Sequence, residues 1–94
     1  MNVYFAQSAK ADIKEIHNHI ARENPSIAAS VISAIERATD RLSTFPLSGR
    51  NGAVETTREL VVPRLPFIVV YRKTPEAVEI IAVFHAAQDK PRSL

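Results

Sequence analysis

Residues 49–85 read GRNGAVETTRELVVPRLPFIVVYRKTPEAVEIIAVFH, and this stretch decides the fold. It holds three segments rich in Val, Ile, Thr, Phe and Tyr, the residues that suit the pleated, half-buried surface of a sheet. Proline-bearing breaks at 63–66 and 74–75 separate these segments. The pattern therefore predicts an antiparallel meander with three strands, at residues 55–62, 67–72 and 78–84.

The middle strand of this meander is apolar on both faces as far as Arg72, which favours a central place in the sheet. Side chains alternate between the two faces of a strand. Strict alternation along the last strand places His85 on the same face as Ile81 and Val83, and Phe84 on the opposite face with Val78. The segment before Gly49 should cover one of these two faces.

The first half of the chain predicts a short strand and two helices. Residues 1–6 are apolar and aromatic, as in a strand, and Ser8 is the expected N-cap of the helix that follows. That helix should end near Arg22. Asn24 should cap the next helix, because Pro25 suits a first helical position but disfavours a helical residue before it.

Apolar residues recur every three or four positions in both helices, which predicts one buried stripe on each. The stripes are Ala9, Ile13, Ile16 and Ile20 in the first helix, and Ala28, Val31, Ile35, Ala38, Leu42 and Phe45 in the second. Residues 43–52 carry the Pro, Gly, Ser and Asn that are typical of a loop.

These elements predict one α+β domain over residues 1–94, of order β-α-α-β-β-β, with a helical hairpin packed on an antiparallel sheet. The tail from Ala86 shows no periodicity and should be irregular. The chain has no cysteine, no secretory signature, and no apolar run near the roughly 20 residues of a membrane span. A cytoplasmic protein without a membrane segment is expected.

Charge alone says little about function. Twelve Lys and Arg against ten Asp and Glu give a formal charge of +2, too small to indicate a nucleic-acid-binding protein by itself. The basic residues after Gly49 are more informative, although ordinary solvation also explains them. They are Arg50, Arg58, Arg64, Arg72, Lys73, Lys90 and Arg92.

The sheet carries three candidate functional residues, Arg58, Arg72 and His85. They could approach one another if the strands pair in chain order, but the sequence leaves the register open. One interpretation is structural, with the arginines in cross-strand ion pairs with glutamates. The other is RNA cleavage, in which arginines hold the phosphate and a histidine, with an ordinary pKa of about 6.5, carries a proton.

Two further features are weaker. Arg50 lies between Gly49 and Gly52 and could present its guanidinium to a phosphate, or simply be exposed in a turn; the P-loop pattern is missing. His17 and His19 are two positions apart, so on a helix they point about 200° away from each other and cannot share a metal ion. No metal and no cofactor are expected.

Several segments taken in order resemble the RelE/ParE superfamily of bacterial type II toxin-antitoxin toxins. They are DIKEIHNHIARENPSIAASVI (12–32), FPLSGR (45–50), TTREL (56–60), VVYR (69–72) and VEIIAVFH (78–85). The resemblance covers nearly the whole chain. It implies a small cytoplasmic growth inhibitor with a helical hairpin on an antiparallel sheet, encoded with an antitoxin that neutralises it.

The superfamily has two mechanistic branches. RelE-like members cut mRNA in the ribosome without a metal, and their pattern has an arginine where this chain has Ile68, another near Ala86 and Ala87, and a tail tyrosine that is absent here. The better studied ParE-like members poison DNA gyrase by stabilising its cleaved-DNA state. The VEIIAVFH ending favours the ParE-like branch.

The resemblance thus implies a gyrase inhibitor that is not an enzyme, with a ribosome-dependent endoribonuclease as the alternative. Under the gyrase interpretation the target-binding residues are Arg50, Arg58, Arg72, His85 and Arg92. Under the alternative, Arg58, Arg72 and His85 are catalytic and the partner is the ribosome with mRNA.

An antitoxin of this class is disordered alone and folds on binding, with a helix in a groove and sometimes a strand at a sheet edge. Apolar residues of the helical hairpin outside its core are the expected contacts, namely Ile20 and Ile27. We expect most of the exposed apolar surface to lie on this hairpin.

Overall fold

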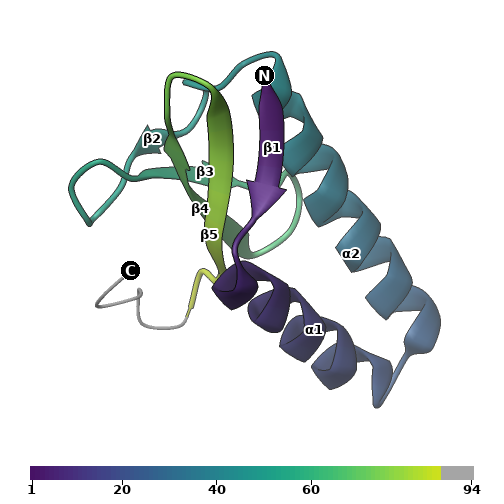
Figure 1. Cartoon of the computed structure of the whole chain (residues 1–94). Helices are drawn as coiled ribbons and strands as arrows, with labels where there is room; N and C mark the ends of the chain where they lie inside the picture. The colour runs from purple at the N-terminus through teal and green to yellow at the C-terminus, as the bar shows by residue number, and fades with distance from the viewer. Residues whose placement is uncertain (88–94) are drawn as a thin grey trace.

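The structure is a computed structural model that describes residues 1–87. Two helices lie on one side of a sheet (Figure 1), so the predicted α+β class and helical hairpin are confirmed. The elements are β1 (Asn2–Phe5), α1 (Gln7–Ala21), α2 (Pro25–Asp40), a 3-10 turn η1 (Arg41–Ser43), β2 (Arg50–Asn51), β3 (Arg58–Val61), β4 (Phe67–Lys73) and β5 (Ala77–His85). The sequence analysis missed two short elements, the turn η1 and the strand β2, which lies inside the predicted loop.

The sheet has the strand order β1-β5-β4-β3-β2. Strands β3, β4 and β5 form the predicted antiparallel meander, with β4 at the centre. However, β1 pairs with β5 in parallel, with Asn2 opposite Ala77 and Phe5 opposite Ile80. The predicted antiparallel sheet thus includes one parallel pair, at this edge, because the meander returns beside β1 running in the same direction.

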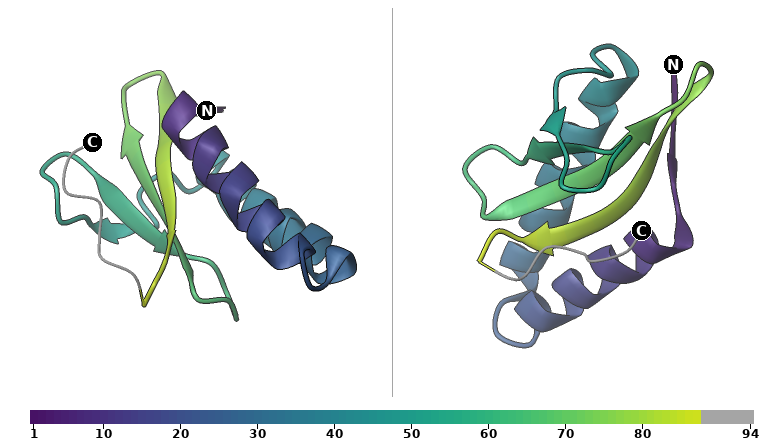
Figure 2. Two further views of the ribbon diagram at one scale, coloured as in Figure 1. Left: turned by 90° about the horizontal axis from the view of Figure 1, so that it is seen from below. Right: turned by 90° about the vertical axis from the view of Figure 1, so that its left-hand side faces the viewer.

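Both helices cover the same face of the sheet (Figure 2). The predicted stripe of α2 is buried from Ala28 to Leu42, and it packs against side chains of β4 and β5 such as Val69 and Ile80. Phe45 was wrongly assigned to this stripe and is 63% exposed. The reason is that α2 ends at Asp40 and the 3-10 turn η1 follows at Arg41–Ser43, so the helical spacing that would have buried Phe45 does not continue to it.

Of the two predicted N-caps, the structure has only Asn24, whereas α1 ends at Ala21 with Arg22 as its C-cap, as predicted. The Asn24 side chain accepts a hydrogen bond from the Ile27 amide at 3.1 Å, which confirms it as the N-cap of α2. Ser8 is not the N-cap of α1, since Ala6 occupies that position. The Ser8 hydroxyl instead donates to the Ile81 carbonyl at 2.6 Å.

This Ser8 contact belongs to an attachment of α1 to the edge of β5. Where β1 has ended, the Asp12 carboxylate accepts a hydrogen bond from the Val83 amide at 2.9 Å, one turn after Ser8. Burial raises the pKa of the Asp12 carboxyl above its ordinary value; the Val83 amide opposes this and repulsion from Glu15 adds to it. Two side chains of α1 therefore satisfy backbone groups that an edge strand would otherwise leave unpaired.

A bulge in β5 changes which residues face the helices. Val70 is opposite Ala82 but Tyr71 is opposite Ile80, so Ile81 is an extra residue. A bulge shifts the alternation by one position. The predicted faces therefore hold up to Ile81 and are wrong from Ala82 onward.

After the bulge, Val83 joins the helix-facing core with Ile80. His85 follows it onto this face, since its partner Phe67 also belongs to that core. Ile81, Ala82 and Phe84 form a second apolar cluster on the other face with Ile68 and Val70.

Candidate functional site

The structure separates the three candidate residues of the sheet. Arg58 is opposite Tyr71 on β4, and His85 is opposite Phe67. Tyr71 and Phe67 are four residues apart on one strand, which corresponds to about 13 Å at roughly 3.3 Å per residue. Arg58 and His85 thus lie near opposite ends of β4.

Arg72 lies on the other face of the sheet from Arg58, because its position on β4 is adjacent to Tyr71. Its side chain is 3.6 Å from the Glu79 carboxylate across the strand pair. It also donates from Nε to the Thr56 hydroxyl at 3.3 Å. This residue therefore makes the cross-strand ion pair that the structural interpretation predicted.

Arg58 supports the loop before the sheet. Its Nη1 donates to the Gly49 carbonyl at 2.7 Å and to the Leu47 carbonyl at 3.3 Å. A second support comes from Tyr71, which is fully buried. The Tyr71 hydroxyl donates to the Pro46 carbonyl at 2.8 Å and accepts from the Gly49 amide at 2.9 Å. Residues 46–49 are therefore held by two side chains of the sheet.

Packing rather than phosphate binding accounts for Gly49. A Cβ atom at this position would lie 2.7 Å from the Tyr71 ring and 2.9 Å from the Glu59 carbonyl. Any larger residue would push the loop off the sheet. The glycine therefore reports close approach of the loop to β3 and β4.

Arg50 is the basic side chain that this loop exposes. It is 57% exposed, and its Nη2 lies 3.2 Å from Oε1 of Glu59, whose side chain is only 4% exposed. The other Glu59 oxygen accepts a hydrogen bond from the Ala53 amide at 3.3 Å. The buried carboxylate is thus neutralised, while the guanidinium of Arg50 keeps an outer face toward solvent.

The His85 side chain makes contacts within the protein. Its ring meets that of Phe67 edge to face, with centroids 5.4 Å apart, and its Nδ1 accepts from the Ala87 amide at 3.0 Å. Arg92, the remaining predicted target-binding residue, lies outside the described residues. His17 and His19 are exposed on α1, and no three His, Asp or Glu side chains within residues 1–87 gather as a metal-ligand set.

The expectation about exposed apolar surface was wrong. Within residues 1–87, the large apolar side chains that are exposed are Met1, Tyr4, Ile27, Phe45, Leu47 and Val61. Of these, Ile27 alone lies on the helical hairpin, and Ile20 is half-buried against the core. The stripes of the hairpin are used against the sheet, so the exposed apolar residues collect instead at the loop after α2 and along strand edges.

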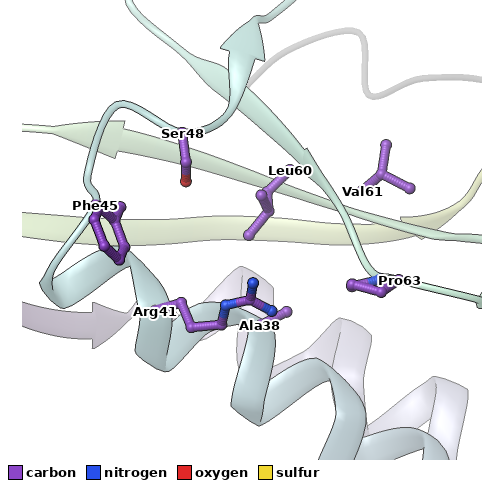
Figure 3. Close-up of a pocket in the computed structure, with 7 residues that line it drawn as sticks. All are labelled: Ala38, Arg41, Phe45, Ser48, Leu60, Val61 and Pro63. Carbon is purple, nitrogen blue, oxygen red and sulfur yellow. The ribbon is translucent and has the colours of Figure 1, made fainter.

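A pocket lies among these exposed residues, between the end of α2 and the edge of β3 (Figure 3). Its volume is about 160 Å³. Its lining residues are Ala38, Arg41, Phe45, Ser48, Leu60, Val61 and Pro63. The sequence analysis missed this pocket, because the residues that form it are distant in sequence and Phe45 was placed in the core.

Within residues 1–87 neither helix has the length and apolar content needed to cross a membrane.

A family of toxins and a relative with a toxin's name are both similar to this chain in sequence. The family described as "ParE toxin of type II toxin-antitoxin system, parDE" matches residues 3–90. Protein Y4kP of Sinorhizobium fredii, whose name marks it as a candidate toxin, is 42% identical over 82 residues, which cover 87% of this chain and 84% of Y4kP.

Two solved structures share the fold. A chain of the chromosomal ParDE TA system from P. aeruginosa superposes with a TM-score of 0.81 at 23% identity, covering 90% of this chain and 95% of that one. A chain of the toxin-antitoxin complex RelBE2 from Mycobacterium tuberculosis superposes with a TM-score of 0.62 at 28% identity, covering 93% and 92%.

Proposed function

This chain belongs to the ParE toxin family of type II toxin-antitoxin systems, and from that premise we propose that it inhibits bacterial growth by poisoning DNA gyrase. In this proposal it acts in the cytoplasm by binding and not as an enzyme. It stabilises gyrase in the state in which the DNA is cleaved. A cognate antitoxin neutralises it by forming a complex.

The observation that carries the proposal is the separation of Arg58, Arg72 and His85. Cleavage of RNA without a metal needs a base, a cation and an acid around one phosphate. Here Arg58 and His85 lie about 13 Å apart along β4 by the usual strand rise, and Arg72 is on the other face with Glu79. Each side chain also has a partner within the protein. This arrangement favours structural roles over joint catalysis.

We assign target contact chiefly to Arg50. Its loop is fixed by Arg58 and Tyr71, so the exposed guanidinium is presented without a large loss of conformational entropy on binding. Leu47, also exposed, lies in the same loop. A rigid loop with a cation and an apolar side chain suits a protein surface, in which arginine is a frequent anchor.

Purified protein and purified gyrase test this proposal. We expect the wild-type protein to inhibit supercoiling and to increase the amount of cleaved DNA trapped on gyrase. Arg50→Glu should reduce this effect by about tenfold or more, and thermal unfolding checks that the variant is folded, because the substitution also removes the partner of the buried Glu59 carboxylate. Lys14→Glu, which reverses the charge of an exposed residue on α1, is the matched control and should retain the effect.

The similarity to RelBE2 is the reason to test the second candidate function, the ribosome-dependent endoribonuclease, in parallel. The mRNA on translating ribosomes should remain intact when this protein is added. Cuts in the mRNA at codon spacing, together with unaffected gyrase, would overturn the gyrase proposal.

A further inference from the structure

The strand β1 forms one end of the sheet, and its outer side is open. It pairs with β5 on one side, and within residues 1–87 no strand lies on the other side. In the right view of Figure 2, β1 is the outermost strand, and α1 leaves its end back toward the rest of the molecule. The strand is held at both ends. The amino group of Met1 donates to the Ser43 carbonyl at 3.1 Å. The Ala6 amide donates to the Ile80 carbonyl at 2.8 Å.

This edge lacks the features that usually prevent strands from associating. Natural sheets protect their edges with charged side chains, prolines or bulges. Residues 1–6 contain no Lys, Arg, Asp, Glu or Pro, and β1 pairs with β5 in an unbroken register. Tyr4 adds a large side chain that is 55% exposed. The strand at the opposite end of the sheet, β2, is only two residues long and begins with the charged Arg50. The edge of β1 is therefore the one at which another strand is expected.

The backbone groups that face the open side belong to Val3 and Phe5. The Ala6 amide bonds to β5, and successive residues of a strand point their backbone groups to alternate sides. The groups of Tyr4 consequently face β5, and those of Val3 and Phe5 face outward. The side chains of Val3 and Phe5 pack against the helix-covered core, so the Tyr4 side chain lies on the other face of the sheet.

These positions match a second copy of the same strand. In an antiparallel pair, opposite residues exchange both N–H···O bonds at every second position. If Val3 is opposite Phe5 of a second copy, Phe5 is also opposite Val3 of that copy, and every outward group of β1 is paired. Tyr4 then lies opposite its own counterpart at a two-fold axis, as in an isologous interface.

Neighbouring registers are less suitable for two copies of β1. A shift of the axis to Val3 would require the backbone of Met1, whose amino group is already hydrogen-bonded. A shift of the axis to Phe5 would require Gln7, which already belongs to α1. A shift by one residue would set outward groups against groups that face β5. The register with Tyr4 at the axis is therefore the one that the strand supports.

The side chains of β1 also suit this register. Val3 and Phe5 of opposite copies form apolar cross-strand pairs on the helix side. The two Tyr4 side chains meet on the other face, at a position without hydrogen bonds between the strands, where opposite side chains come closest. No charged side chain of β1 has to be buried.

Charged residues beside this edge complement one another across the two-fold axis. Phe5 lines a hollow together with Glu36, Arg37 and Asp40 of α2. Neither ion pair found among residues 1–87 includes these three charges. Arg37 lies between the two acidic residues along α2, so a second copy can set its Arg37 against either of them. Exposed pairs of this kind add little affinity, but they favour this orientation of the two copies.

We propose that the chain forms a two-fold symmetric homodimer through its β1 strands, which pair antiparallel with Tyr4 at the axis. The combined sheet has the strand order β2-β3-β4-β5-β1-β1-β5-β4-β3-β2. The two loops that expose Arg50 lie at the far ends of this sheet, so the dimer leaves them accessible. A target with two copies of the binding surface would then be bound by both loops of one dimer with higher avidity.

A single engineered cysteine tests the register. The chain has no cysteine, so Tyr4→Cys introduces one thiol. At the axis the two Cβ atoms would be about 4.5–5.5 Å apart or slightly less, close to the separation of about 3.5–4.5 Å in a disulfide. We expect mild oxidation of the purified chain to give a covalent dimer in high yield.

Asn2→Cys is the matched control, because this residue is exposed on the same strand and the same face. In the proposed register the two copies of residue 2 are four residues apart along the strands, which corresponds to about 13 Å. A disulfide needs Cα atoms within about 7 Å, so this variant should stay monomeric on a reducing-agent-free gel. Equal cross-linking of both variants, or none in Tyr4→Cys, would overturn the proposal.

Light scattering on the purified chain without antitoxin tests the dimer itself. The mass should approach twice 10.4 kDa as the concentration rises. Tyr4→Lys places like charges opposite each other at the axis and should weaken self-association by about tenfold or more. Ile27→Lys, at an exposed apolar residue of α2, should leave it unchanged. Thermal unfolding checks that both variants are folded. A wild-type chain that remains monomeric, or equal effects of the two substitutions, would contradict the proposal.

Amide hydrogen exchange identifies what covers the edge. The Val3 and Phe5 amides should exchange at least about tenfold more slowly in the dimer than in dilute protein. Protection that appears only when antitoxin is added would show that a segment of the antitoxin covers this edge, and the homodimer would be wrong. All these measurements use neither gyrase nor ribosomes, so the homodimer and the gyrase proposal can each fail while the other stands.

Discussion

The guanidinium of Arg58 donates a hydrogen bond of 2.7 Å to the carbonyl oxygen of Gly49. This contact joins the first strand of the meander to the loop that precedes it. It makes Arg58 a positioning residue for the loop, whereas Arg50, one residue after Gly49, is the side chain that the loop exposes. Arg58 thus holds the loop, Arg50 is presented beside it, and Arg72 pairs with Glu79 on the other face.

Arg58→Ala should lower the free energy of unfolding by about 1–2 kcal/mol, the usual range for a partly exposed hydrogen bond from a charged group. Growth inhibition should fall in proportion to the fraction that remains folded. Chemical denaturation measures the first effect. Lys14→Ala, an exposed residue of α1, is the control and should shift stability by no more than about 0.5 kcal/mol. Loss of growth inhibition at unchanged stability would instead indicate direct target contact by Arg58.

Tyr71→Phe should destabilise the protein by about 1–3 kcal/mol. The Pro46 carbonyl and the Gly49 amide lose the Tyr71 hydroxyl as their hydrogen-bond partner, at a position where the Tyr71 side chain is buried. The ring itself remains in the core. Faster hydrogen exchange at the Gly49 amide should accompany the loss. Tyr4→Phe removes a hydroxyl from an exposed residue of β1 and should leave the stability unchanged. Equal stability of the two variants would refute the role of Tyr71 in anchoring the loop.

Asp12→Asn should reveal a pH dependence of stability. Burial raises the pKa of the Asp12 carboxyl above 3.8, with a contribution from Glu15 that adds and one from the Val83 amide that opposes. A raised pKa in the folded state contributes stability that is fully present below the unfolded value and is lost as the pH rises through the folded value.

The stability of the wild-type protein relative to Asp12→Asn should therefore decrease as the pH rises from below 3.8 to neutrality. Denaturation curves of both proteins across this window measure the difference. Taking this difference in the free energy of unfolding removes the contributions of the other carboxylates, because they titrate in both proteins. A difference that stays constant, or that changes in the opposite direction, would show that the Val83 hydrogen bond outweighs burial.

His85→Phe should retain both fold and growth inhibition. The histidine ring contacts Phe67 edge to face, and a phenyl ring can make the same contact, which is worth about 0.5–1.5 kcal/mol. A phenyl ring cannot carry a proton. Growth curves after induction at matched expression levels test this; abolished toxicity in a stably folded variant would support catalysis by His85.

Much of the fold follows from local sequence signals. Asn24-Pro25 sets the start of α2 by a side-chain cap and a fixed φ angle, and the prolines near 63–66 separate two strands of the meander. The errors came from tertiary contacts. Ser8 looks like a cap, but the edge of β5 binds its hydroxyl. The bulge at Ile81 cannot be recognised from the sequence. Residues 80–84 are all apolar, so the side chains are buried equally well with or without a shift of the alternation.

The candidate site could be predicted only as a set of residue types. The sequence singled out Arg50, Arg58 and Arg72, but it could not show that they differ in role, because this depends on register. Arg58 comes beside the Gly49 carbonyl only through its pairing with Tyr71. The pocket was missed for the same reason, since it forms between α2 and the edge of β3.

The most direct test of the central claim is a comparison of DNA breaks and mRNA cuts in the same cells after induction of the toxin without its antitoxin. Breaks and cuts are mapped by sequencing both nucleic acids from one culture. The gyrase proposal predicts gyrase-bound DNA breaks that appear with growth arrest, Arg50→Glu greatly reducing them, and intact translated mRNA. Codon-phased cuts in mRNA without DNA breaks would contradict it.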